Sequence, residues 1–146
     1  MQPEIHLNYA AILVAVISNF AIGGLWYGPL FGKAWIKEMG HPADWQPAKG
    51  AMVRAMVLSF VGAFFTAYVL AHEVVVWRPS VWGVGEDQAP AVYGFFAAMF
   101  PWLGFQVPIL LNNVGYENKS WKNFGIGAGY QFVALLSMGM ILSYWR

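Results

Sequence analysis

Residues 7–32, LNYAAILVAVISNFAIGGLWYGPLFG, contain no charged side chain and decide the fold class. Three further uncharged stretches follow, at residues 55–71, 88–116 and 123–145. A hydrocarbon core of about 30 Å is crossed by roughly 17 to 25 mainly apolar helical residues, so each stretch is long enough to span a bilayer. We therefore predict transmembrane helices near residues 8–31, 51–72, 90–111 and 123–144.

The composition of the whole chain also favours a membrane protein. Of 146 residues, 59% are hydrophobic and only 10% are charged, whereas a soluble domain carries roughly 25% charged residues. A soluble domain of this length would expose large apolar patches to water, and a lipid solvent removes that conflict. The apolar residues run continuously instead of alternating, which favours helices over a transmembrane barrel. The sequence predicts an all-α integral membrane bundle, with residues 1–146 forming a single domain.

The distribution of Lys and Arg predicts an orientation. Six basic residues belong to the first and third loops and the adjoining helix ends: Lys33, Lys37, Lys49, Arg54, Lys119 and Lys122. The opposite side has two, Arg78 and Arg146. By the positive-inside rule we expect both termini on the non-cytoplasmic side of an inner (plasma) membrane. The leader MQPEIHL lacks the basic region of a signal peptide, so we expect the first span to be retained.

Small residues recur at four-residue spacing in three of the predicted helices. The residues of these stripes are Gly24, Gly28 and Gly32, then Ala55, Ser59, Ala63, Ala67 and Ala71, then Gly125 and Gly129. Such stripes let helix backbones approach closely, which is how membrane helices associate. Packing within the chain is the favoured interpretation, and an interface between subunits is the alternative. Gly28 is the better candidate for a subunit interface.

The few polar residues within the spans are candidates for lining a pathway. Asn19, Gln106 and Gln131 lie within the first, third and fourth spans. They serve either as interhelical hydrogen-bonding groups or as a solute lining. No acidic or basic residue lies in the middle of a span, which argues against an ion-coupled carrier. Pro101 and Pro108 are expected to break the third helix, and Trp102 beside Pro101 indicates a kink or a packed interior contact.

The predicted external face is the place where acid–base or metal chemistry could assemble. It collects Glu4, His6, His72, Glu73, Glu86 and Asp87. His72 and Glu73 are adjacent and lack the spacing that puts two ligands on one helix face, so we predict no metal site and no catalytic residue. The external loop, residues 76–90, holds Trp77 and Trp82 and either lies on the membrane surface or docks a partner. The net charge is +1, so the chain lacks the excess of basic residues that is typical of nucleic-acid binding.

Two stretches of the chain resemble a known family. They are residues 8–35, with the run LWYGPLFGKAW at 25–35 as the most specific part, and residues 102–145, with PILLNN and KSWKNFGIGAGYQFVALLSMGMILSYW. They are similar to domain-of-unknown-function family 1761, small bacterial four-span membrane proteins. The resemblance implies the fold and an inner-membrane location, and it brings no established reaction. Relatives often have Asn and His where this chain has Gly127 and Gln131, so a titratable role there is in doubt.

The leading functional prediction is a non-enzymatic membrane protein that acts as a homo-oligomer or as an accessory subunit of a membrane complex. Its expected partners are the lipid bilayer and either a second copy or another membrane protein, and no cofactor is expected. The alternative is a small channel or carrier for a neutral or weakly polar solute, suggested by Asn19, Gln131 and the prolines of the third helix.

Overall fold

The computed structural model describes residues 5–145, which are largely helical and form no strand within that range. The elements are α1 (Tyr9–Leu25), η1 (Trp26–Leu30), α2 (Gly32–Glu38), α3 (Lys49–Val76), η2 (Pro79–Trp82), α4 (Pro90–Pro101), η3 (Trp102–Gln106), α5 (Val107–Tyr116) and α6 (Trp121–Tyr144). Four helical spans are long and apolar enough to cross a membrane: Tyr9–Leu30, Lys49–Val76, Pro90–Tyr116 and Trp121–Tyr144. The predicted fold class, an all-α bundle of four transmembrane helices, is confirmed.

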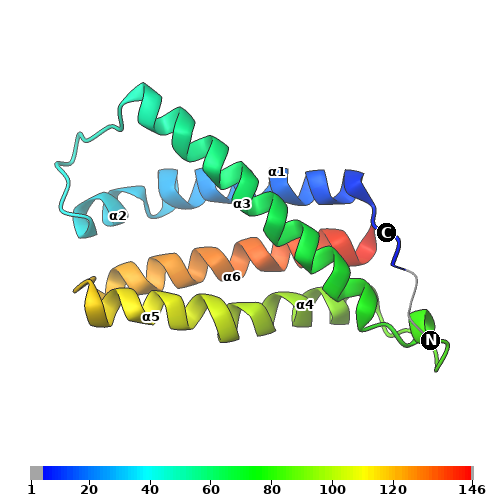
Figure 1. Ribbon diagram of the computed structural model, residues 1–146. Coiled ribbons are helices and arrows are strands. Elements are labelled where there is room, and N and C mark those ends of the chain that lie inside the picture. The colour runs from blue at the N-terminus through cyan, green and yellow to red at the C-terminus, as the bar shows by residue number, and fades with distance from the viewer. Residues whose placement is uncertain (1–4, 146) are drawn as a thin grey trace.

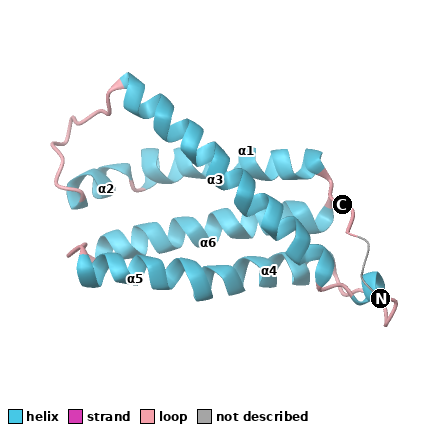
Figure 2. Ribbon diagram, in the orientation of Figure 1, coloured by secondary structure: helices cyan, strands magenta, loops and turns pink. Residues whose placement is uncertain are grey.

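α6 lies at the centre of the bundle, between α1 on one side and α4 and α5 on the other, and α3 crosses over them (Figure 1). Loops are confined to the two ends of the molecule (Figure 2). The beginning of α1 and the end of α6 lie at the same end, which we call the terminal end. The other end carries α2, and we call it the α2 end.

The core occupies the terminal half of the bundle. Its residues come from the beginnings of α1 and α4 and from the ends of α3 and α6. Many of them are small: Ala11, Ala15, Ala67 and Ala98 are all 0% exposed. Lipid gives no hydrophobic drive between helices, so close backbone approach and van der Waals contact hold such a bundle together.

The first span is shorter as a regular helix than predicted and ends in a bend. α1 stops at Leu25, and η1 is a π-helical turn in which Gly28 leaves the helical conformation just before Pro29. Proline has no N–H for the helix ladder, which explains a bend at this place. The chain then forms α2, a short helix that the sequence did not predict. The side chain of Ser120, the N-cap of α6, hydrogen-bonds to Glu38 at the end of α2 and so ties α2 to α6.

The third span runs from Pro90 to Tyr116, but its first α-helix ends at Pro101, so the predicted interruption is present there as a change of helix type. At Pro108 the prediction is wrong, because α5 is not interrupted. After Pro101 the helix continues as η3, a π-helical turn in which the N–H of Val107 donates to the carbonyl of Trp102. Pro108 is the second residue of α5, where its N–H is not needed. The helix runs five residues beyond the predicted end at 111 and stops before Asn118, whose φ of 54° places it in the left-handed region.

α3 is longer than the predicted range of 51–72, and its first half leaves the bundle. Every residue from 49 to 62 is exposed, whereas Ala63, Ala67 and Ala71 are buried. Figure 1 shows the beginning of α3 diverging from the other helices toward the α2 end. α3 is therefore held by its second half alone, and an open space lies beside the first half.

Candidate functional site

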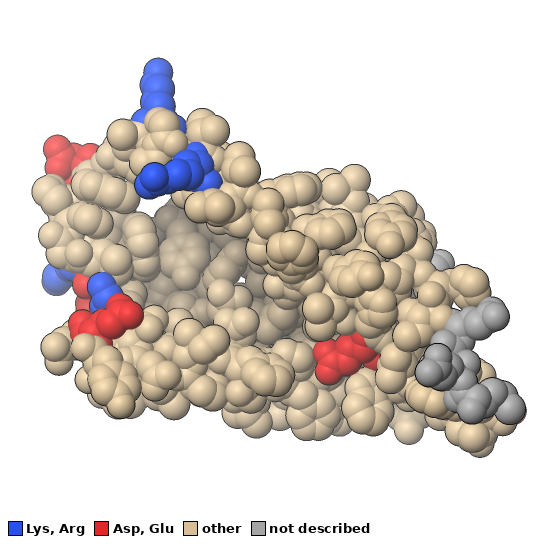
Figure 3. All heavy atoms as spheres, viewed as in Figure 1, with Lys and Arg blue, Asp and Glu red and all other residues tan. Residues whose placement is uncertain are grey.

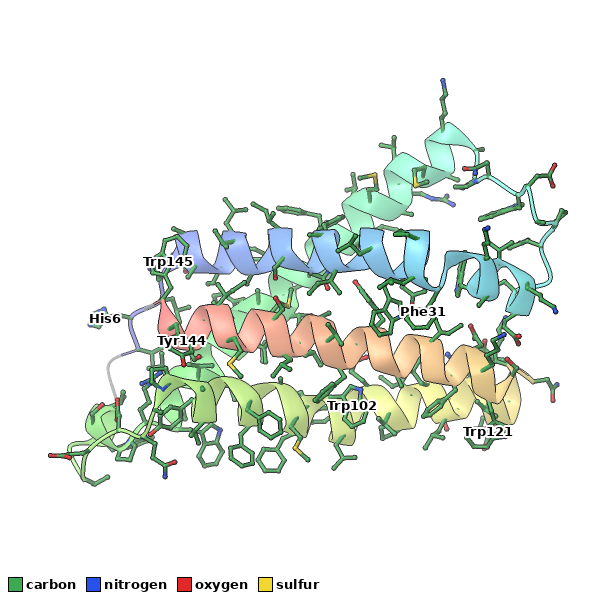
Figure 4. The ribbon with its side chains drawn as sticks, turned by 180° about the vertical axis from the view of Figure 1, so that it is seen from behind. His6, Phe31, Trp102, Trp121, Tyr144 and Trp145 are labelled. Atoms are coloured by element: carbon green, nitrogen blue, oxygen red, sulfur yellow. The ribbon has the colours of Figure 1, made fainter. Side chains whose placement is uncertain are left out.

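Two tryptophans on opposite sides of α6 donate hydrogen bonds to its backbone. The Trp26 indole N–H donates to the carbonyl of Ile126 at 3.0 Å, and that of Trp102 donates to the carbonyl of Ala128 at 2.8 Å. The Trp102 ring also packs edge-on against Phe132 at 5.0 Å. The predicted interior contact of Trp102 is thus confirmed. Figure 4 shows Trp102 and Phe31, whose ring packs against Trp26, on opposite sides of α6.

Half of the predicted small-residue positions pack within the chain. Ala63, Ala67 and Ala71 are buried in the core. A Cβ atom at Gly129 would lie 2.9 Å from ring carbon Cζ2 of Trp26, and one at Gly32 would clash with the carbonyl of Tyr27. Gly129 and the three alanines need small side chains for contacts between helices, whereas Gly32 needs one because the backbone of its own preceding turn lies close.

The other half do not pack within the chain, so the prediction of intramolecular packing is wrong for them. Ala55 and Ser59 lie on the diverging part of α3, and a Cβ atom at Gly24, Gly28 or Gly125 would meet nothing within 4 Å. Helix periodicity identifies a face of small residues, but it does not say whether a neighbour covers that face.

The closest helix approach was missed by the sequence analysis. Gly94 of α4 and Gly139 of α6 meet backbone to backbone: a Cβ atom at Gly94 would lie 2.8 Å from the Gly139 carbonyl oxygen. Gly94 is followed four residues later by Ala98, and Gly139 by Ser143, so each glycine begins a pair of small residues at four-residue spacing. These two pairs were not among the predicted stripes, although both lie at the closely packed contact between α4 and α6.

A polar cleft of about 280 Å³ opens between the first half of α3 and the facing sides of α1 and α6. Figure 3 shows the molecule hollowed between α3 and the helices beneath it. Asn19, Gln106 and Gln131, the three residues predicted as a polar lining, all border this cleft. Ser59 and Thr66 of α3 add hydroxyl groups to its wall. The structure thus brings together polar residues from four separate elements.

The polar groups of the cleft differ in how far they are satisfied. The Tyr130 hydroxyl donates to Oδ1 of Asn19 at 3.0 Å, which confirms an interhelical hydrogen bond for Asn19. The Thr66 hydroxyl donates to the carbonyl of Gly62 at 3.0 Å. By contrast, the side-chain amides of Gln106 and Gln131 make no hydrogen bond to the residues that the structure describes.

The position of the cleft makes those two free amides costly. Asn19, Gln106 and Gln131 lie near the middle of spans that contain 22, 27 and 24 residues. Moving an unpaired amide from water into hydrocarbon costs roughly 4 to 8 kcal/mol on a cyclohexane scale. No residue lining the cleft is charged at neutral pH. The arrangement therefore suits water, or a neutral group that both donates and accepts hydrogen bonds.

The terminal end contains a buried arginine, Arg78, which the sequence alone had indicated only as one of the two basic residues on this side. Arg78 is 1% exposed. Its guanidinium donates to Asp87 at 3.3 Å and to the carbonyl of Ser143 at 3.0 Å, while its Nε donates to the carbonyl of Val74. It also lies 4.5 Å from the ring centroid of Tyr93. Arg78 thereby joins the ends of α3 and α6 to the loop at residues 76–90 and to α4.

Asp87, in the loop at residues 76–90, completes this cluster. Its Oδ1 accepts the backbone N–H of Ser80 at 3.0 Å. Hydrogen bonds from Ser80, and then from Arg78, hold the pKa of the Asp87 carboxyl below its ordinary value. The loop is therefore folded against the bundle, with Trp82 bonded through its indole N–H to the Val76 carbonyl and Trp77 71% exposed.

The structure brings together no group of metal-ligating side chains within the described range. Among residues 5–145, no three His, Asp or Glu side chains come close enough to hold a metal ion. Nδ1 of His72 lies 2.9 Å from the Tyr68 carbonyl, to which it can only donate. Of the predicted external set, Glu4 lies outside the described residues. The cleft is accordingly the candidate site, and its chemistry is hydrogen bonding.

Comparison with known proteins identifies one family. The sequence profile of the family described as "protein of unknown function (DUF1761)" matches residues 10–143. No curated protein and no solved structure matches the chain. The matched range contains every residue of the cleft and all of the four spans except Tyr9 and Tyr144 at their outer ends. The chain therefore belongs to the DUF1761 family of proteins of unknown function.

Proposed function

We propose that the protein is a non-enzymatic subunit of a membrane assembly, and that a second copy packs its transmembrane helix against the first half of α3. One observation carries the proposal: residues 49–62 are exposed on every side, next to a cleft with two unpaired amides at mid-membrane depth. A helix seated there would cover the free length of α3 and shield the polar cleft from lipid.

The dimensions of this surface suit a partner helix. Fourteen residues at 1.5 Å each give about 21 Å of uncovered helix, most of the thickness of a hydrocarbon core. Ala55 and Gly62 lie within this length, and such small residues allow the close approach that holds membrane helices together. A polar side chain on the partner would satisfy Gln106 or Gln131.

Disulfide cross-linking in native membranes tests the proposal. The chain has no cysteine, so a single Ala55→Cys substitution reports on one position. Oxidation should convert this variant into a disulfide-linked dimer, whereas Val69→Cys, 61% exposed on the half of α3 that packs in the bundle, should stay monomeric. A photo-cross-linker at position 55 would reveal a different partner as a band that is no multiple of 16.3 kDa. Monomer alone in both experiments would refute the assembly role.

A second function, passage of a neutral solute, is favoured by the convergence of Asn19, Gln106 and Gln131 on one cleft. Three amides at one depth offer donors and acceptors that replace the hydration of a small polar molecule. Vesicles containing the protein should take up a solute such as glycerol or urea faster than empty vesicles. The Asn19→Leu, Gln131→Leu double variant should lose the increase, and Asn112→Leu, at an exposed position outside the cleft, should keep it. Equal uptake by full and empty vesicles would exclude this function.

We propose further that the α2 end faces the cytoplasm and that both termini face away from it, in an inner membrane. Lys and Arg gather at the α2 end in Figure 3, which supports the proposal through the positive-inside rule. Arg146 lies outside the described residues, and Arg78 at the terminal end is engaged with Asp87. A reporter that is active only in the cytoplasm should be silent when fused after residue 146 and active when inserted at Asp44. The reverse result would invert the topology.

A further inference from the structure

A second cavity lies on the lipid-facing side of the bundle near the terminal end, away from the polar cleft. It has a volume of about 310 Å³ and lies between the end of α3 and the first turns of α4. Its wall is mainly apolar and aromatic, and includes Trp77, Tyr93, Phe96 and Phe100. One carboxylate, that of Glu73, also lines it. We call this cavity the aromatic pocket.

The Glu73 carboxylate has no partner among the residues that the structure describes. It makes neither a hydrogen bond nor an ion pair within residues 5–145. The neighbouring cation, Arg78, is committed to Asp87 and to the carbonyls of Val74 and Ser143. The negative charge of Glu73 is therefore left without compensation in an apolar wall. A carboxylate at the edge of a membrane span is expensive unless a cation accompanies it.

The aromatic side chains of the pocket complement the Glu73 carboxylate as a binding surface for a cation. Phe96 and Phe100 stack at 5.5 Å between ring centroids, one turn apart on α4. Tyr93, one turn earlier, already holds the guanidinium of Arg78 against its ring, which shows that this part of α4 tolerates a cation on an aromatic face. Aromatic faces attract alkylated ammonium groups, and a nearby carboxylate adds the opposite charge.

We propose that the aromatic pocket binds an alkylammonium group, with Glu73 as its counter-ion and Trp77, Phe96 and Phe100 as its walls. A metal ion does not suit the pocket, because Glu73 is accompanied there by a single further oxygen donor side chain outside the aromatic residues, Gln88. A neutral guest would leave Glu73 uncompensated. The group reaches the pocket either as an ethanolamine lipid headgroup or as a free amphiphilic amine, since both present the same ammonium chemistry at the membrane surface.

Calorimetric titration of the purified protein in dodecylmaltoside with benzyltrimethylammonium tests the proposal. The control ligand is neopentylbenzene, which has the same shape with carbon in place of the charged nitrogen. The cation should bind and the neutral compound should bind at least about tenfold more weakly, a difference of about 1.4 kcal/mol. Equal binding of the two compounds, or no binding of the cation, overturns the proposal.

Two matched variants test whether the Glu73 carboxylate is the counter-ion of the bound cation. Glu73→Gln keeps the shape of the side chain and should weaken cation binding about tenfold. Glu86→Gln removes a carboxylate from the exposed external loop and should leave binding unchanged. Circular dichroism and gel filtration establish that both variants keep the native fold. Undiminished binding by a folded Glu73→Gln protein overturns the proposal.

Nanodiscs distinguish the two sources of the ammonium group. They contain the same fraction of phosphatidylglycerol, and the remaining lipid is either phosphatidylethanolamine or a neutral glycosyl diacylglycerol. Weaker binding of benzyltrimethylammonium in phosphatidylethanolamine supports a lipid headgroup in the pocket, because the two compete. Equal affinity in both supports a free amine. The readout is independent of cross-linking at position 55, so this proposal and the assembly role fail separately.

Discussion

Trp26 lies against the backbone of Gly129, so closely that a methyl group at position 129 would be 2.9 Å from ring carbon Cζ2. The ring cannot slide away freely, since its N–H is bonded to the carbonyl of Ile126 on the same helix. This pair fixes the bend after α1 against the middle of α6. It positions the wall of the cleft that contains Tyr130.

Gly129→Ala should therefore destabilise the protein. We expect the free energy of unfolding to fall by about 1 to 3 kcal/mol, the usual cost of overpacking. Gly125→Ala, one turn earlier on α6 with nothing near its Cβ position, should leave stability unchanged or slightly raised, because alanine favours helix. The measurement is unfolding in mixed SDS and dodecylmaltoside micelles, followed by circular dichroism. A smaller cost of Gly129→Ala in a Trp26→Leu background would assign the effect to this contact.

Gly139→Ala should be the most damaging glycine substitution among those in α6. The new methyl group would meet backbone atoms of Gly94, which cannot rotate away as a side chain can. We expect a loss above that of Gly129→Ala, since α4 and α6 must separate. Gly62→Ala, at a position with open space around it, is the control in the same unfolding assay. Equal stability of the two variants would show that the helices are not in backbone contact.

Arg78→Met should lower the free energy of unfolding by about 3 kcal/mol, because it leaves Asp87 and the Ser143 carbonyl without their buried partner. Arg54→Met, which removes an exposed arginine from the diverging part of α3, should change stability by less than about 0.5 kcal/mol. Thermal unfolding in detergent compares the two. A similar effect for both would mean that the cluster around Arg78 contributes little.

The stability of the terminal end should depend on pH through Asp87. Hydrogen bonds from Ser80 and from Arg78 lower the pKa of Asp87 in the folded protein. A group with a lowered pKa stabilises the fold above its unfolded value, near 4, and that contribution disappears as the pH falls through the folded value. Stability should thus be flat between about pH 7 and 5 and fall below about 4. Asp87→Asn should be less stable at pH 7 and should show a smaller decline in acid.

Water in the polar cleft can be detected by labelling. Ser59→Cys places a thiol on the cleft wall, and Leu58→Cys places one at a position that is 65% exposed and does not line the cleft. Maleimides react with the thiolate, which forms only where water reaches. A membrane-permeant polar maleimide should label position 59 faster than position 58 in purified protein. Equally slow labelling of both would mean that the cleft is dry.

The spans were predictable because a membrane helix must satisfy its backbone internally and carry an uncharged surface of defined length. Asn19, Gln106 and Gln131 were identified for a related reason: polar groups are rare in hydrocarbon, and each needs a physical justification. Their convergence on one cleft depends on how the helices pack, which no single stretch of sequence encodes.

The divergence of the first half of α3 could not be predicted, because hydrophobicity does not distinguish a helix surface that faces lipid from one that faces protein. The residues of this half are as apolar as those of the packed half, because lipid and protein interior present similar surroundings. Ala55 and Ala67 thus look alike in the sequence, although one is exposed and the other is fully buried. Arg78 was missed because its partners come from the end of α6 and from a loop nine residues later. Only the closed bundle brings them together.

The divergence of α3 gives the molecule unequal cross-sections in the two leaflets. At the terminal end Arg78 draws the helices together, whereas at the α2 end α3 stands apart from the rest (Figure 1). The lipids around the α2 end must make room for a broader object than those on the opposite side. A single copy of this shape is expected to prefer membrane curvature that widens the leaflet around the α2 end, and a partner helix packed against α3 would change that preference.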